Sequence, residues 1–180
     1  MERPAKRDLG FSLIELILVV VIIGIVVSVA VPKMNRTARS ASGKALKMDL
    51  ARLYSAIELY AVEHAGKPPD QNIKAQLTQY SDFTGSTTDP MKKPTLGIVY
   101  GPYLTKVPSL TVGSKNGANE ICHTADPCET PATADVSQGW WYNIATREIV
   151  ANLSDTEVDE DGVPYNTYTG GTGDAQGPTQ

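Results

Sequence analysis

Apolar residues fill one uninterrupted stretch near the amino terminus. The stretch runs for 21 residues from Phe11 to Val31, and only four of its positions are not plainly apolar: Ser12, Glu15, Gly24 and Ser28. At 1.5 Å per residue a helix of this length measures about 31 Å, close to the hydrocarbon thickness of a bilayer. The pattern predicts a membrane-spanning helix and argues against a wholly cytosolic enzyme.

A second apolar pattern follows Pro32 at helical spacing. Its positions recur at intervals of four and three residues: Leu46, Leu50, Leu53, Ile57 and Tyr60. This is one stripe of an amphipathic helix, and the run Gly66-Lys67-Pro68-Pro69 predicts where that helix stops. We expect one long helix from about residue 11 to about residue 65, kinked at Pro32 because proline removes a backbone hydrogen bond.

The remainder of the chain predicts a small sheet with long loops. Two segments have strand character, Gly139–Ile144 and Glu148–Ala151, and Ala145–Arg147 between them is typical of a hairpin turn. Trp140 and Tyr142 share one face by alternation, so we expect them to pack against the helix stripe. A short helix is expected at Ile73–Tyr80. The predicted class is α+β, with the long helix against a small antiparallel sheet.

The organisation of the chain follows from these patterns. A short polar segment precedes the apolar stretch, and the carboxyl-terminal part is rich in Asp, Gly and Thr. The expected parts are a leader at 1–10, an apolar half-helix at 11–32, an amphipathic half-helix at 33–66, a β-rich globular part at 67–153, and an acidic and glycine-rich loop or tail at 154–180.

Charge and residue inventory exclude several functions. The formal net charge is −4, which argues against a nucleic-acid binder that works through bulk positive charge. The chain has two histidines and shows no nucleophile elbow, phosphate-binding loop or His-Glu-x-x-His motif. We therefore expect a protein that is not an enzyme.

Three interpretations compete for the amino terminus. It is an ordinary membrane anchor, a secretory signal cleaved after Ser28-Val29-Ala30, or a leader cut before the apolar stretch. A signal peptide has an apolar region of only about 7–15 residues, which disfavours the second interpretation.

The carboxylate of Glu15 bears on the choice, because a charge inside an apolar span is costly. One interpretation is that Glu15 lies close enough to the end of the span to reach the headgroups. The other is that a cut after Gly10 creates an α-amino group on Phe11, which is mostly charged at neutral pH and pairs with Glu15 of the same or a neighbouring chain.

The amino terminus combines three features: a short basic leader, the string Gly10-Phe11-Ser12-Leu13-Ile14-Glu15-Leu16, and Pro32 after the apolar stretch. Together they resemble the amino terminus of type IV pilins and of type II secretion pseudopilins. The carboxyl-terminal segments Trp140–Asn143 and Glu148–Asn152 are most similar to a major pseudopilin. The resemblance implies cleavage between Gly10 and Phe11 by prepilin peptidase, N-methylation of Phe11, and a role for Phe11 and Glu15 in assembly.

The resemblance also implies a function and a location. The chain would be a structural subunit of a helical filament, a homo-oligomer lifted from the bacterial inner membrane by a separate assembly machinery, with its globular part outside the cytoplasm. Five cations lie just after the span, within residues 33–47, and three precede it, which by positive-inside counting alone favours the opposite orientation. The alternatives are an adhesive, motility or minor pilin, and a single-span anchored binding domain that does not polymerise.

Two further sites follow from an extracytoplasmic location and from the resemblance. Oxidising conditions favour a disulfide between Cys122 and Cys128, which enclose a short loop. Major pseudopilins commonly hold calcium in the carboxyl-terminal loop, and the acids here follow the spacing of oxygen ligands: Asp155, Glu157, Asp159 and Asp161. The alternative is that these acids, with Glu160, form a solvated loop without a metal.

Overall fold

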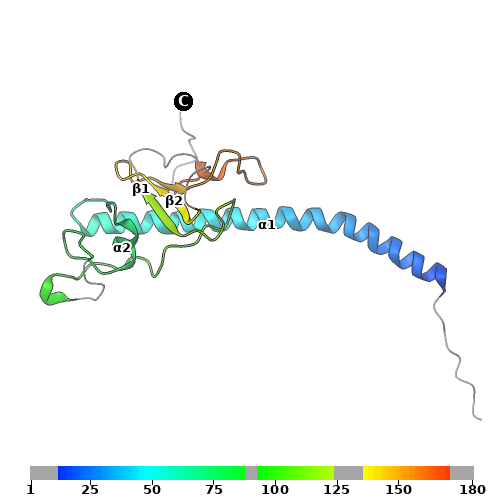
Figure 1. Ribbon diagram of the computed structural model, residues 1–180, viewed down its shortest axis with the longest axis horizontal. Helices are drawn as coiled ribbons and strands as arrows, with labels where there is room; N and C mark the ends of the chain where they lie inside the picture. The colour runs from blue at the N-terminus through cyan, green and yellow to red at the C-terminus, as the bar shows by residue number, and fades with distance from the viewer. Residues whose placement is uncertain (1–11, 88–92, 124–135, 171–180) are drawn as a thin grey trace, which may run out of the picture. The chain divides into compact units, whose positions relative to one another are not determined.

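The computed structural model describes residues 12–87, 93–123 and 136–170 (Figure 1). The chain forms two compact units, Met1–Ala38 and Arg39–Gln180. Helix α1, Leu13–Glu63, contributes its first part to one unit and its second part to the other. The expected long helix is therefore confirmed to within two residues at each end, and its helical backbone continues through Pro32. The kink at Pro32 stays a prediction.

The end of α1 follows the expected glycine signal. Ala65 and Gly66 both have left-handed backbone conformations, with φ of 56° and 83°. The amide of Gly66 donates a hydrogen bond of 2.7 Å to the carbonyl of Ala61, which closes the last turn. Glycine adopts this conformation without steric cost, so it ends the helix as predicted.

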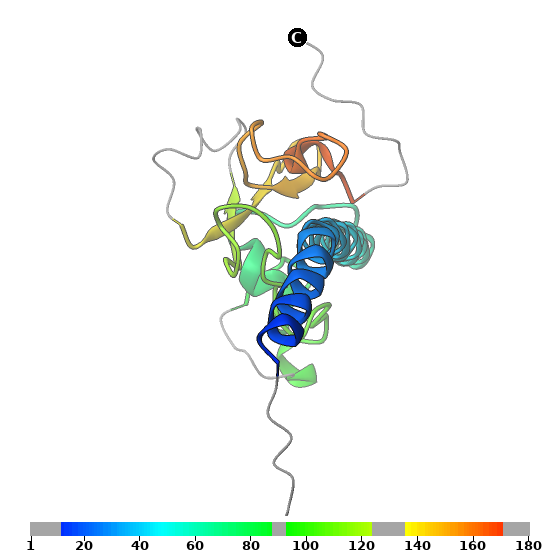
Figure 2. The ribbon, with the colours of Figure 1, turned by 90° about the vertical axis from the view of Figure 1, so that its right-hand side faces the viewer.

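The second unit contains α2 (Ile73–Thr78), the short 3-10 helices η1 (Pro94–Leu96) and η2 (Tyr165–Thr167), and three strands. The strands are β1 (Glu120–His123), β2 (Gln138–Tyr142) and β3 (Ile149–Ala151), in the order β1-β2-β3. Figures 1 and 2 show the sheet and the loop that follows β3 on one side of the second part of α1. The α+β class is confirmed.

The expectation of an antiparallel sheet is only half correct. Strands β2 and β3 are antiparallel, with Trp140 opposite Ala151, but β1 and β2 are parallel, with Cys122 opposite Trp141. A parallel pair cannot be closed by a tight turn and needs a longer crossover. The chain supplies this length between His123 and Gln138, and so the sheet is mixed.

The core joins the helix stripe to the sheet, as expected from the sequence. All five stripe residues are buried, and they belong to one apolar cluster with Trp140 and Tyr142 of β2. Burial of a large apolar side chain contributes roughly 1.5–3 kcal/mol, so this cluster is the main source of stability for the second unit. Ile73 and Leu77 of α2 extend it.

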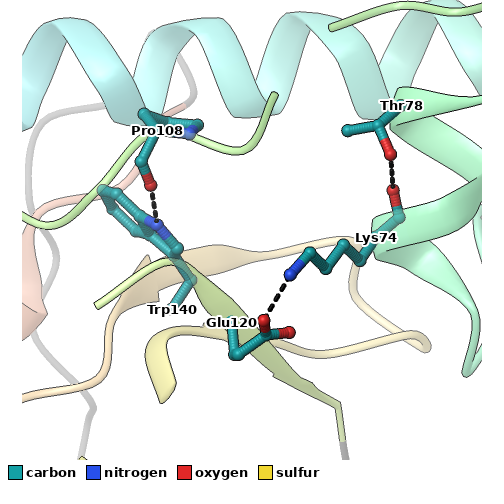
Figure 3. Close-up of polar contacts among 5 residues, drawn as sticks. All are labelled: Lys74, Thr78, Pro108, Glu120 and Trp140. Atoms are coloured by element: carbon teal, nitrogen blue, oxygen red, sulfur yellow. Dashed lines mark hydrogen bonds and ion pairs between the residues drawn. The ribbon is translucent and has the colours of Figure 1, made fainter. Parts of the chain in front are cut away.

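Polar contacts fix the elements around that core (Figure 3). The indole Nε1 of Trp140 donates a hydrogen bond of 2.8 Å to the carbonyl of Pro108. The ammonium of Lys74 on α2 pairs with the carboxylate of Glu120 on β1. The first contact satisfies a donor at the edge of the core, and the second links α2 to the edge strand.

His64 has a structural position at the end of α1. Its ring is buried, with Nδ1 2.8 Å from the carbonyl oxygen of Tyr60 and Nε2 3.0 Å from that of Asp82. The ring also stacks on Tyr60, with 3.9 Å between centroids. These contacts join the last turn of α1 to the loop that follows α2.

Candidate functional site

The first part of α1 presents apolar side chains on every side. Leu13–Val31 is 19 residues long with a mean hydropathy of 3.1, and none of it is buried. It is the one described helix long and apolar enough to cross a membrane. At 1.5 Å per residue it measures about 28 Å, which matches the predicted span.

Glu15 is the acidic residue of the first turn of α1. Its side chain is exposed, and every other described side chain from Ser12 to Val31 is exposed as well. The helix begins where the amide of Leu16 bonds the carbonyl of Ser12, at 3.2 Å. Gly10 and Phe11 lie outside the described residues, so their cleavage, the methylation and the pairing with Glu15 stay predictions.

The cysteines lie at the start of the segment between β1 and β2. Cys122 is half-buried on β1, opposite Trp141. Cys128 lies outside the described residues, so the Cys122–Cys128 disulfide stays a prediction.

The acidic loop 155–161 is folded by hydrogen bonds to its carboxylates. Glu157 accepts bonds from the backbone amides of Ser114 and Ser154, and it also accepts from both hydroxyl groups. Partial burial raises the pKa of Glu157, but these donors outweigh that effect and hold the pKa below its ordinary value. Glu157 thereby connects the loop to the turn before β1.

Asp159 organises the second half of the loop. Its Oδ1 accepts bonds of 2.8 Å and 2.9 Å from the amides of Asp161 and Val163, and its Oδ2 accepts from the phenol of Tyr168. Desolvation raises the pKa of Asp159, but the hydrogen bonds from Tyr168 and the two backbone amides lower it by more. The pKa of Asp159 therefore lies below its ordinary value.

The four predicted calcium ligands do not share one centre. Asp155 accepts a hydrogen bond of 2.6 Å from the side-chain Nδ2 of Asn166, whereas Glu157 and Asp159 accept hydrogen bonds from other, separate groups of donors. In the described part of the chain, no group of three or more His, Cys, Asp or Glu side chains could hold a metal ion. This arrangement does not support the predicted calcium site, which stays a prediction from the sequence.

Two partners of the acidic loop were absent from the sequence interpretation. Ser114 is 43 residues from Glu157 in the chain, and Tyr168 follows the loop. Tyr168 carried a usable signal, because a tyrosine close to an acid-rich turn can donate to a carboxylate. The contact of Ser114 depends on how the sheet and loops pack, and no local pattern reports it.

The motif at the start of the chain matches a known family. A family model described as the prokaryotic N-terminal methylation motif matches residues 5–31. The chain carries this methylation motif. The match spans residues 5–10 of the predicted leader, the cleavage position, Glu15 and the apolar stretch.

Curated proteins show a distant similarity over a longer segment. The type II secretion system core protein G of Klebsiella michiganensis is 32% identical over 82 residues, which cover 45% of this chain and 56% of that protein. The core protein G of Vibrio cholerae is 31% identical over 78 residues, 43% of this chain and 53% of that protein. The competence protein ComGC of Halalkalibacterium halodurans is 29% identical over 68 residues, 38% of this chain and 67% of that protein.

These matches confirm the resemblance to type IV pilins and pseudopilins. The chain spans about half the length of the core G proteins it matches. No solved structure matches it significantly.

Proposed function

We propose that this chain is a structural subunit of a pilus-like filament, most like the major pseudopilin of a type II secretion system. The methylation motif and the similarity to core protein G support this assignment. The subunit would be cut between Gly10 and Phe11 by a prepilin peptidase and assembled by a separate machinery. Before assembly it would lie in the inner membrane, with the second unit on the extracytoplasmic side.

One observation carries the proposal: a single carboxylate, Glu15, in the first turn of a helix whose described side chains are otherwise uncharged up to Val31. A helix that only anchors a domain gains nothing from a charge in its apolar span. In a bundle of such helices, contact with lipid is replaced by contact with protein, and polar pairs between helices add specificity. Glu15 of one subunit paired with the Phe11 amine of the next would set the register of the stack.

A pilus-type subunit is the second candidate. The similarity to ComGC covers a comparable stretch of the chain, so the relatives do not all belong to secretion systems. Both candidates share processing and assembly through α1. They differ from the remaining alternative, a single-span anchored domain that does not polymerise.

The assembly claim is tested by Glu15→Val in cells that form the filament. The variant span becomes more apolar, so we expect normal insertion and cleavage, together with a loss of sheared filaments measured by immunoblot. Ser28→Ala is the matched control, because it also removes a polar group from the span but not the charge. A filament yield equal to that of the unaltered chain would show that Glu15 merely reaches the headgroups.

A further inference from the structure

The side of the second part of α1 that faces away from the core carries large apolar side chains that stay exposed in the described chain. It lies opposite the core stripe, and we call it the outer α1 face; its residues are Ala41, Lys44, Met48, Arg52, Ser55, Leu59 and Val62. Met48, Leu59 and Val62 are 61%, 50% and 75% exposed. The water-facing side of a helix is normally polar, so three large apolar side chains there require an explanation.

The charge on this face has one sign. Lys44 and Arg52 are exposed, and none of the seven residues is acidic. The guanidinium of Arg52 lies 3.5 Å from the carboxylate of Asp49, and the Arg52 side chain remains 66% exposed. The outer α1 face therefore combines apolar area with positive charge.

A second surface of the same chain has the complementary character. Asp155 and Asp161 of the acidic loop are exposed, no Lys or Arg follows Arg147, and Val163 beside the loop is 37% exposed. Within residues 12–87, 93–123 and 136–170, no ion pair involves the acids of this loop. One cation that acts on it is Lys47 of the same chain, whose ammonium lies over the Tyr168 ring and whose charge lowers the pKa of Asp159. The loop surface thus offers negative charge next to an apolar side chain.

We infer that the outer α1 face of one copy binds the acidic loop surface of the next copy. Opposite charges across the contact would select this pairing. The two surfaces differ, so the contact is head-to-tail, and a head-to-tail contact that does not close into a ring extends into a helical filament. The inference rests on the proposed filament function and names the surfaces that the second unit contributes to it.

The test is charge reversal in the full-length chain, with sheared filament as the readout. Lys44→Glu with Arg52→Glu should lower filament yield about tenfold, because acids would then face the acidic loop of the next copy. Adding Asp155→Lys and Asp161→Lys should restore the yield. Lys106→Glu, at an exposed lysine away from the outer α1 face, is the matched control and should leave the yield unchanged.

A second measurement uses the unaltered chain and does not depend on the folding of a variant. A carbodiimide joins lysine to carboxylate groups in direct contact, so filaments should give cross-linked peptides that pair Lys44 with the 155–161 segment. The detergent-extracted monomer should not give them, and Lys44→Arg should remove them.

The outcomes separate the two claims. If the unaltered chain forms no filaments, the proposed function fails. If filaments form and the Lys44 and Arg52 reversals leave their yield unchanged, the inference is wrong. A yield that falls and is not restored by the loop reversals would also overturn it, since the cations would then contact another partner such as lipid headgroups.

Discussion

The guanidinium of Arg147 donates a hydrogen bond of 2.8 Å to the carbonyl of Gly66, and so ties the β2–β3 turn to the residue that ends α1. Arg147 has a left-handed backbone, with φ of 62°. Glycine is the usual residue in that conformation because a side chain strains it. The contact with Gly66, together with a carboxylate of Glu58 at 3.9 Å, offsets this strain.

This arrangement predicts an order of stability for two variants. Arg147→Ala keeps the strained backbone and loses both contacts, so it should destabilise the second unit by about 1 kcal/mol. Arg147→Gly loses the same contacts but relieves the backbone strain, so it should lower the stability by less than Arg147→Ala does. Urea unfolding of a fragment comprising residues 36–180 measures both. Equal stability of the two variants would show that the turn carries no strain.

Two leucines on α1 should respond very differently to truncation. Leu53 is fully buried in the core and Leu59 is half exposed on the outer α1 face. Leu53→Ala should cost about 2–5 kcal/mol because it leaves a cavity. Leu59→Ala should stay within about 0.5 kcal/mol in the same fragment. Urea unfolding measures the free energy of unfolding of both variants. A large decrease in stability for Leu59→Ala would show that the outer α1 face contributes to folding rather than to contact between copies.

Acid should weaken the second unit through Glu157 and Asp159. The pKa values of both carboxyls lie below their ordinary values of 4.5 and 3.8 in the folded chain. The unfolded chain then binds more protons as the pH falls, so stability is present above pH 4.5 and is lost below it. Melting temperatures of the fragment from pH 6 to pH 3 should fall less steeply in Glu157→Gln. Glu148→Gln, at an exposed acid outside the loop, should keep the original slope.

The calcium prediction needs a separate test. The carboxylates of the acidic loop already accept hydrogen bonds from the protein, so the fold of the loop does not require a metal. A calcium ion bound only by the folded state would raise the melting temperature of the fragment at millimolar concentration. Asp159→Ala with Asp161→Ala should abolish the rise, and magnesium should do less because it prefers a tighter octahedron. Identical curves with calcium and with chelator would leave the loop held by hydrogen bonds alone.

Sequence reasoning succeeded where one local pattern decides the structure. The spacing of the core stripe gave α1 and its buried face, and the alternation of Trp140 and Tyr142 gave the inward face of β2. The methylation motif lies in 27 contiguous residues, 5–31, and was therefore readable without a fold.

Sequence reasoning failed where pairing between distant segments decides the structure. Strand β1 has only four residues, and its parallel partner begins 15 residues after it ends. Its apolar content, Ile121 with Cys122, is too short to distinguish a strand from a loop. The contact of Glu157 with Ser114 likewise depends on how distant segments pack, so no local pattern predicts it.

The central claim, that the chain is a processed filament subunit, is tested most directly by the intact mass of the protein recovered from its native membrane and filament fractions. We expect a chain that lacks residues 1–10 and carries one added methyl group on Phe11, whereas a bulky substitution at Gly10 leaves the full-length form. A mature chain that still begins at Met1, or a Gly10 variant that matures normally, would contradict the account.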